Sequence, residues 1–406
     1  MNATGKERLH PAGAVPMPAT LAGHLRHVPD PRVARTRRHT LGDILTVAVC
    51  AILCGYGSYY DMSEFCADYL DWLRLWIGLE GGVPSHDTFR RVLGLVDPGH
   101  FRNVFRLWAE AVSGGAADGQ VAIDGKALRG SPGGSGGVQY IVNAWSAGRH
   151  LVLGQVKVED KANEIVAIPE LIPSLDIRGA LVSIDAIGCQ KGIAGLIRRR
   201  GGHYLLALKD NNPLVRSEME GFLLDAIAHG DGHVDHHASV EKGHGRVERR
   251  ECWVSGELGW FADRGKWKDL RRVVMVRATR TVGGVAGAPE RRLYLCSKDL
   301  TAEEALAATR AHWGVESMHW VLDMVFDEDR SRARSGNAAE NLALVRRMAY
   351  NLLCMERDAQ AKAAGDKARA PRLKQLMRRA ARRDEFRSRM MRVFGGPGGR
   401  TEGEVA

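Results

Sequence analysis

The spacing of apolar residues divides the chain into a helical first part and a second part in which strands alternate with helices. Between residues 41 and 113, apolar side chains recur every three or four positions, as on amphipathic helices. After residue 118 the pattern changes to short apolar runs bounded by glycine or polar residues, which is typical of buried strands. Three strands are followed by helix, strand, helix and strand, at 120–126, 139–146, 150–158, 164–172, 180–185, 191–200 and 203–208. We therefore expect a mixed sheet flanked by helices.

Two of these strands carry the same dipeptide, Ile-Asp, which places Asp124 and Asp185 at strand ends. An aspartate in a buried strand is costly unless it is hydrogen-bonded, paired or bound to a metal. A single such aspartate is often a turn former or a helix N-cap, and for Asp185 taken alone that interpretation is favoured. Two together favour a paired site, in which a divalent cation relieves the repulsion. The two strands must then be neighbours, as they are in a ribonuclease H-like core.

A third acidic residue lies on the helix that the pattern predicts after residue 300. Glu316 stands between Trp313 and Trp320 on one expected helix face. A carboxylate in that position either pairs with an arginine or faces a polar site. Beside Asp124 and Asp185, Glu316 is the natural third ligand of a cation.

Residues 210–300 interrupt this alternation. Strand-like runs at 248–254, 272–278 and 292–296 indicate an inserted, mostly β subdomain. The segment also contains four histidines whose spacing matches no zinc pattern, so a solvated loop is the better interpretation: His233, His236, His237 and His244.

The net charge of +10 favours a polyanionic partner, and its distribution is uneven. Residues 346–392 hold fifteen lysines and arginines against five acidic residues, which is a net charge of +10 in that segment alone. Within it, residues 369–392 form a basic amphipathic pattern that either grips DNA or is a solvated helix. Residues 1–40 form a smaller basic arm without periodicity, which either contacts phosphates or is a tail without function.

The helical first part contains a candidate DNA-reading element. Ser85 is a plausible N-cap for a helix that carries Arg90 and Arg91. Short helices joined by tight turns are consistent with a helix-turn-helix-like reader of DNA. The aromatic residues between 61 and 79 recur at helical spacing, which favours a core over a base-stacking surface.

Cysteine usage and hydropathy bear on the compartment. Seven cysteines show no CxxC pair, which favours free thiols in a reducing environment. No signal-peptide pattern is evident, and the apolar run at 44–53 is too short to span a bilayer. We expect a cytoplasmic protein without membrane contact.

Several motifs stand in a specific order along the chain. They are Asp-Gly-Lys-Ala-Leu-Arg-Gly-Ser at 124–131, Ser-Ile-Asp-Ala-Ile-Gly-Cys-Gln-Lys at 183–191, Tyr-Leu-Leu-Ala-Leu-Lys at 204–209, Glu-Lys-Gly-His-Gly-Arg at 241–246 and His-Trp-Gly-Val-Glu at 312–316. Together they resemble insertion-sequence transposases of the ISAs1 family, which include the H-repeat-associated proteins of the IS4-like DDE group. Leu-Gly-Asp-Ile at 41–44 and Pro-Ser-His-Asp-Thr-Phe at 84–89 resemble the helical N-terminal domain of that family.

The resemblance implies a DDE transposase on a ribonuclease H-like fold. Asp124, Asp185 and Glu316 would hold two Mg²⁺ (or Mn²⁺) ions for cleavage and strand transfer of DNA ends. The implied partners are double-stranded DNA, as terminal inverted repeats and as target, and a second copy of the chain in a DNA-bound homodimer. The cations expected to meet phosphates are Lys126, Arg129, Lys209 and Arg246, with Arg90 and Arg91 in the helical domain.

The implied domain organisation has four parts. A flexible basic arm at 1–40 precedes an all-helical domain at 41–113. The catalytic domain covers 118–355 with its β-rich insertion at about 210–300, and a basic tail covers 356–406.

This sequence departs from the family pattern after Glu316. Family members have one more residue between the glutamate and the following Leu-His-Trp, and a missing residue rotates a helix by about 100°. Either Glu316 or the later face would then be out of register unless a local bulge absorbs the change. The Tyr, Arg and Lys that accompany the IS4-type glutamate are also not evident, since Thr309, His312 and Asp323 stand at those spacings. The alternative function is therefore a catalytically impaired copy that acts only as a DNA-binding protein.

Overall fold

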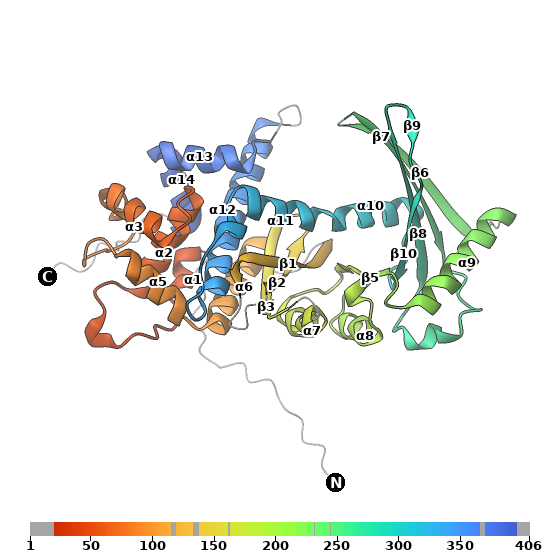
Figure 1. Ribbon diagram of the computed structural model, residues 1–406, viewed down its shortest axis with the longest axis horizontal. Coiled ribbons are helices and arrows are strands. Elements are labelled where there is room, and N and C mark those ends of the chain that lie inside the picture. The colour runs from red at the N-terminus through yellow and green to blue at the C-terminus, as the bar shows by residue number, and fades with distance from the viewer. Residues whose placement is uncertain are drawn as a thin grey trace, which may run out of the picture.

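A computed structural model describes residues 20–114, 119–132, 138–160, 163–230, 232–243, 245–365 and 370–395 of the chain. The molecule is elongated (Figure 1). Helices from both ends of the chain gather at one end of it, a long ribbon of strands forms the other end, and a mixed sheet lies between them.

The central part of the sheet has the strand order β3-β2-β1-β4-β5. Strands β1, β4 and β5 are parallel, whereas β2 and β3 are antiparallel to their neighbours. Both strands that carry Ile-Asp are therefore direct neighbours, as the sequence required. Their bounds are β1 (Gln120–Pro132), β2 (Val138–Ser146), β3 (Leu151–Val158), β4 (Leu181–Ile184) and β5 (His203–Leu208).

The segment expected as an inserted β subdomain continues this sheet. Residues Leu205–Leu208 of β5 pair antiparallel with Leu293–Cys296 of β10, so the added strands complete the edge that β5 would otherwise expose. The sheet then runs on through β8 and β7 to β6, with β9 paired to β8. The elements are α9 (Pro213–His229), β6 (Val234–Gly243), β7 (Arg246–Ser255), β8 (Arg272–Val282), β9 (Val285–Ala286) and β10 (Glu290–Cys296).

Alternate residues of β1 show which helices cover each face of the sheet. Val121 and Ile123 lie in the core formed with α7 (Glu164–Ser174) and α8 (Lys191–Arg199), while Ala122 lies in the core formed with the helical end of the molecule. Asp124 is two residues after Ala122, so its side chain lies on the same face as Ala122. The second face is also crossed by α10 (Ala302–His312) and α11 (Gly314–Met324) (Figure 1).

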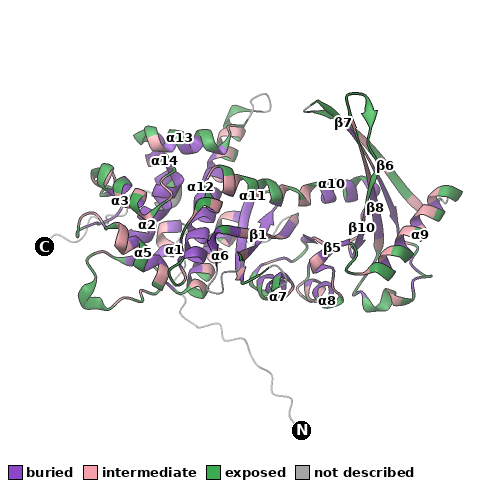
Figure 2. Ribbon diagram, in the orientation of Figure 1, coloured by how far each residue is buried: buried purple, intermediate pink, exposed green. Residues whose placement is uncertain are grey.

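The helical end is built around α2, whose residues are buried along almost its whole length (Figure 2). Helices from residues 21–113 and from residues 338–395 pack around it in one continuous apolar core. They are α1 (Leu21–Leu25), α2 (Leu41–Leu53), α3 (Tyr59–Asp68), α4 (Leu70–Leu73), α5 (His86–Leu95), α6 (Pro98–Ser113), α12 (Ala338–Ala364), α13 (Leu373–Arg382) and α14 (Asp384–Gly395).

Two expectations about the chain ends differ from the structure. Leu21 and Leu25, within the predicted flexible arm, are fully buried against α6 and α14. The predicted tail contains α13 and α14, where Leu376 and Met391 are buried and the Tyr69 hydroxyl donates to the carbonyl of Ala381 at 3.1 Å. The amphipathic pattern of the C-terminal segment was visible in the sequence, but its packing partner was not, since Tyr69 and Ala381 are 312 residues apart. The arm shows no periodicity in the sequence, so local patterning did not indicate that part of it would be buried. Residues 1–19 of the arm lie outside the described residues.

None of the described helices combines the length and the hydropathy needed to cross a bilayer.

A glycine sets the position of α11 on the sheet. A methyl group added at Gly314 would overlap the ring of Trp145 on β2, whereas Gly221 in the middle of α9 has open space around it. We predict that Gly314→Ala lowers the free energy of unfolding by about 1–3 kcal/mol, since overpacking forces the neighbours to shift. Gly221→Ala should instead raise it by about 0.5–1 kcal/mol through helix propensity. Urea unfolding of both variants measures the difference, and equal effects would show that Gly314 is not a close-approach position.

Candidate active site

Three acidic side chains predicted from the sequence line one cleft. Ile123 of β1 pairs with Ile184 of β4, so Asp124 and Asp185 follow at the same end of adjacent parallel strands. Glu316, in the first turn of α11, faces them from above the sheet. The cleft has a volume of about 250 Å³, and its other charged lining residues are Lys209, Asp210, Arg216, Glu290, Arg291 and Arg292.

The electrostatics of the cleft centre on Asp124. Burial raises the pKa of its carboxyl from 3.8 to about 7, and the neighbouring charges of Glu164, Asp185 and Glu316 push in the same direction. A hydrogen bond from the Gly125 amide opposes the shift without cancelling it. Asp124 is therefore a carboxylate that is costly to ionise without an added cation.

Glu164 is a fourth carboxylate that the sequence did not single out as a site residue. It begins α7, is buried, and lies so close to β1 that a methyl group at Gly125 would overlap its carboxylate. Two features could have indicated it: an acidic residue in the first turn of a helix, and a glycine directly after Asp124. Neither feature is specific without the fold, since acidic first turns are common.

The ammonium group of Lys209 lies beside Asp185 in this structure. Burial acts to raise the pKa of Asp185, but a hydrogen bond from the Ala186 amide and the Lys209 ammonium outweigh it and hold the pKa low. The Nζ of Lys209 lies 3.0 Å from Oδ1 of Asp185. The pKa of Glu316 is raised by burial and by the charge of Asp185, against the opposing pull of Arg292.

The carboxylate oxygens of the cleft are of the kind that binds a hard divalent cation, but they do not surround a cation site as they stand. Carboxylate oxygens are the ligands that Mg²⁺ prefers. Among the residues that the structure describes, no three acidic, histidine or cysteine side chains lie close enough together to hold a metal ion as they stand. The Lys209 ammonium therefore supplies at Asp185 the positive charge that a bound cation would supply.

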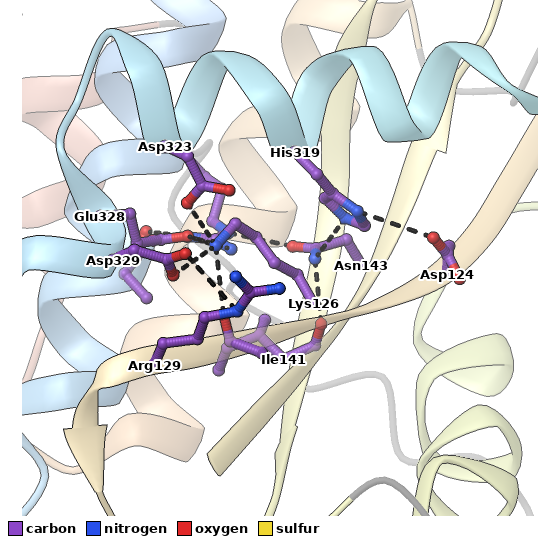
Figure 3. Close-up of polar contacts among 12 residues, drawn as sticks. Asp124, Lys126, Arg129, Ile141, Asn143, His319, Asp323, Glu328 and Asp329 are labelled. Atoms are coloured by element: carbon purple, nitrogen blue, oxygen red, sulfur yellow. Dashed lines mark hydrogen bonds and ion pairs between the residues drawn. The ribbon is translucent and has the colours of Figure 1, made fainter. Parts of the chain in front are cut away.

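Lys126 was expected to meet phosphates, and the structure contradicts this. Its side chain is 6% exposed and points away from the cleft into a group of acidic residues between β1 and α12 (Figure 3). Its Nζ lies 2.7 Å from Asp323, 3.2 Å from Asp329 and 3.4 Å from Glu328. A buried ammonium is stabilised only by such pairing, so Lys126 is held within the protein.

A second buried cation completes this group. Arg347 of α12 forms an ion pair with Glu328, and both side chains are fully buried. Burial alone would raise the pKa of Glu328, but Arg347 and Lys126 outweigh it and lower the pKa to about 2. The group joins β1 to α11 and α12, which follow it about 200 residues later in the sequence (Lys126 and Asp329 are 203 residues apart).

The other expected cations lie at the surface and are dispersed. Arg129 is 77% exposed and its Nε lies 3.8 Å from Asp329. Arg246 begins β7 in the strand ribbon and lies 3.9 Å from Glu248. Arg90 and Arg91, on α5, both pair with Asp87. Of the six expected phosphate contacts, Lys209 is the one that lines the cleft.

The histidines of the insertion also differ from expectation. His236 and His237 lie on strand β6 rather than in a loop, and the ring of His236 stacks on Trp253 at 5.0 Å. His244 lies outside the described residues. Strand pairing with β7 satisfies the backbone of this segment, a contact that the local polar sequence does not reveal.

The helix around Glu316 is interrupted rather than continuous. One helix ends at His312 and the next begins at Gly314, and Trp313 and Trp320 are 39% and 61% exposed. Trp313 nevertheless lines the same cleft as Glu316. After the interruption, α11 directs Glu316 to the cleft, His319 toward Asp124 and Asp323 to Lys126.

The raised pKa of Asp124 predicts a stability effect. Between pH 4 and 7 the folded chain retains a proton on Asp124 that the unfolded chain releases, so stability falls as pH rises through this range. We predict that Asp124→Asn is more stable than the wild type at pH 8 by up to about 4 kcal/mol, with no difference near pH 4. Urea unfolding with a chelator present measures this. The fully exposed Asp71, replaced by asparagine, is the control and should show no such pH dependence.

The family models and the relatives that match this chain agree on one family. The family model described as "Transposase DDE domain" matches residues 116–352, and one described as "DDE_Tnp_1-associated" matches residues 22–109. The "H repeat-associated putative transposase YhhI" of Escherichia coli is 37% identical over 371 residues, covering 89% of this chain and 94% of that protein. An "Uncharacterized protein in dhlA 3'region" of Xanthobacter autotrophicus is 40% identical over 290 residues, covering 70% and 97%.

A solved structure also aligns with the chain. It is described as the piggyBac transposase synaptic complex with hairpin DNA, and it covers 95% of this chain and 84% of that chain at 10% identity and a TM-score of 0.42. A likeness at this level does not distinguish one α/β fold from another. The family match and the relatives are sufficient without it: the chain belongs to the family of transposases with a DDE domain, in agreement with its resemblance to the H-repeat-associated group.

Proposed function

We propose that this protein is an active DDE transposase that cleaves and joins insertion-sequence DNA ends on a ribonuclease H-like sheet. The observation that supports the proposal best is the convergence of Asp124, Asp185 and Glu316 on one cleft. They come from β1 where its pairing with β4 stops, from the end of β4 and from a helix, and are separated by 61 and 131 residues of sequence. Folding has brought together carboxylates that repel one another, which is costly unless the site uses them.

In this proposal Asp124, Asp185 and Glu316 would hold divalent Mg²⁺ or Mn²⁺, two ions in the implied mechanism. When bound, such ions polarise the phosphate and lower the pKa of an attacking water or hydroxyl. Cation binding would also offset the burial and the like-charge repulsion that raise the pKa of Asp124. The carboxylates then remain ionised at neutral pH.

The residues around the three carboxylates have distinct roles in the proposal. Lys209, 55% exposed and paired with Asp185, would exchange that carboxylate for a DNA phosphate when a metal takes its place. Arg292 and Arg216 line the same cleft and add positive charge where the scissile phosphate would lie. His312 is kept neutral, because burial lowers its pKa to about 4, and its Nδ1 lies 3.0 Å from the Ser183 hydroxyl.

Double-stranded DNA, as terminal repeats and as target, is the proposed substrate. Arg129 at the β1 end, Arg246 on the strand ribbon, and Arg90 and Arg91 on α5 are exposed and would contact phosphates away from the cleft. Two ends must be joined to one target, so we propose that a homodimer assembles on DNA.

The alternative, an impaired copy that only binds DNA, rested on the short spacing after Glu316. The structure does not favour it. The interruption at Trp313 precedes Glu316, and the glutamate lines the cleft without an additional residue.

The proposal predicts metal-dependent nicking of the element's own ends. Wild-type protein with Mg²⁺ or Mn²⁺ and DNA that carries the terminal repeats should produce nicked and joined products. Asp124→Ala should lose activity by about 10²–10³-fold or more, the range seen when a group that stabilises transition-state charge is removed. Radiolabelled ends resolved on a denaturing gel measure both products.

Asp210→Ala is the matched control. Asp210 lines the same cleft and is 90% exposed, but it is not among the proposed ligands. If Asp124→Ala and wild type nick equally, the protein is not a transposase of this mechanism. If Asp210→Ala is as inactive as Asp124→Ala, the cleft requires negative charge in general rather than these three residues.

A further inference from the structure

His319 lies between the cleft and the buried ion pairs beneath it. It follows Glu316 by one helical turn on α11, and its side chain is 12% exposed. One ring nitrogen faces Asp124 and the other faces Asn143 of β2 (Figure 3). The role of the ring depends on which nitrogen carries the proton.

The orientation of the Asn143 amide is fixed by its other partners. Arg347 Nε, which can only donate, lies 2.9 Å from Asn143 Oδ1. Asn143 Nδ2 donates to the carbonyl of Ile141 at 3.1 Å. A rotated amide would place its NH₂ group against the guanidinium and lose both bonds. The group that faces His319 is therefore the Nδ2 amide.

This orientation determines the tautomer of His319. Asn143 Nδ2 lies 3.3 Å from His319 Nε2, and an amide nitrogen has no lone pair to offer. His319 Nε2 must then be the acceptor, and the proton of the neutral ring is on Nδ1. A ring nitrogen that accepts a hydrogen bond carries no proton, so the same contact makes the ring neutral.

The Nδ1–H consequently points at the cleft. His319 Nδ1 lies 3.6 Å from Oδ2 of Asp124, which is longer than a hydrogen bond and within reach of a small movement of the carboxylate. Because Nδ1 carries the proton and Nε2 accepts one from Asn143, neither nitrogen has a free lone pair. The ring can therefore act neither as a metal ligand nor as a general base in this arrangement.

We propose that His319 is a positioning residue for Asp124, held as its Nδ1–H tautomer by Asn143 and Arg347, and that it donates to Oδ2 so that Oδ1 faces the cation. The inference rests on the proposed function of Asp124 as a metal ligand. The fully buried pair of Arg347 and Glu328 then has a role at the cleft: Arg347 holds the orientation of the Asn143 amide, and that amide sets the tautomer of His319. Hydrogen-bond partners that orient a ligand are typically worth 10–100-fold in metal affinity or activity.

Two substitutions separate the role of each nitrogen. In His319→Asn the amide occupies the position of Nδ1 and can still donate to Asp124. In His319→Gln the amide reaches the position of Nε2, so the donor to Asp124 is lost. We expect His319→Asn to stay within a few-fold of the wild type and His319→Gln to lose 10–100-fold, both in Mg²⁺ affinity by calorimetry and in nicking rate. Asn143→Leu, which frees the tautomer, should behave like His319→Gln.

Wild-type protein labelled with ¹⁵N-histidine tests the tautomer directly, whether or not the protein cleaves DNA. The nitrogen chemical shifts and proton couplings of His319 should show Nδ1 protonated and Nε2 unprotonated. A ring protonated at Nε2 would overturn the inference, as would equal Mg²⁺ affinities for His319→Asn and His319→Gln at matched melting temperatures. Absence of nicking by the wild type, with the tautomer and the Mg²⁺ affinities as expected, would instead count against the proposed function alone.

Discussion

Repulsion among desolvated carboxylates is the constraint around which the sheet half of this molecule is arranged. Pairing of β1 with β4 brings Asp124 and Asp185 to one strand edge, and α11 and α7 add Glu316 and Glu164. Backbone hydrogen bonds impose this proximity, so the side chains cannot separate without breaking the sheet. The negative charge must be compensated locally, by protons, by cationic side chains or by bound cations.

The nearby cationic side chains are divided unequally between the two aspartates. Lys209 pairs with Asp185 from the cleft side, whereas Lys126, two residues after Asp124, is held by Asp323, Glu328 and Asp329. Among the described residues, the side chain that faces Asp124 most directly is His319, which is neutral and therefore supplies no positive charge. This division keeps Asp124 short of positive charge, which is the condition under which it would bind an added cation most strongly.

The arginines near the C-terminus serve the fold as well as the surface. The sequence gives residues 346–392 a net charge of +10, which suggests a freely available DNA-binding tail. Arg346, Arg347 and Arg387 are instead buried, and Arg387 stacks on Tyr69 and Trp72 at 3.9 and 4.7 Å. Formal charge therefore overestimates what this segment can offer to phosphates, because part of it is neutralised or enclosed in the helical core.

The sequence by itself indicated most of the central helices and strands, the need for the two Ile-Asp strands to be neighbours, and the three carboxylates Asp124, Asp185 and Glu316 as candidates for one site. These follow from local periodicity and from the rule that a buried charge requires a purpose, and both can be read within a few residues. Tertiary structure alone decided that Lys126 is enclosed, that Glu164 packs against β1 at Gly125 and adds its charge near Asp124, that α13 and α14 complete the first helical core, and that β6–β10 extend the sheet. Each of these depends on a partner tens to hundreds of residues away, and side-chain chemistry does not encode which partner it will meet. The proton position on His319 belongs to the same class, since it is set by Asn143 and Arg347 from two other elements.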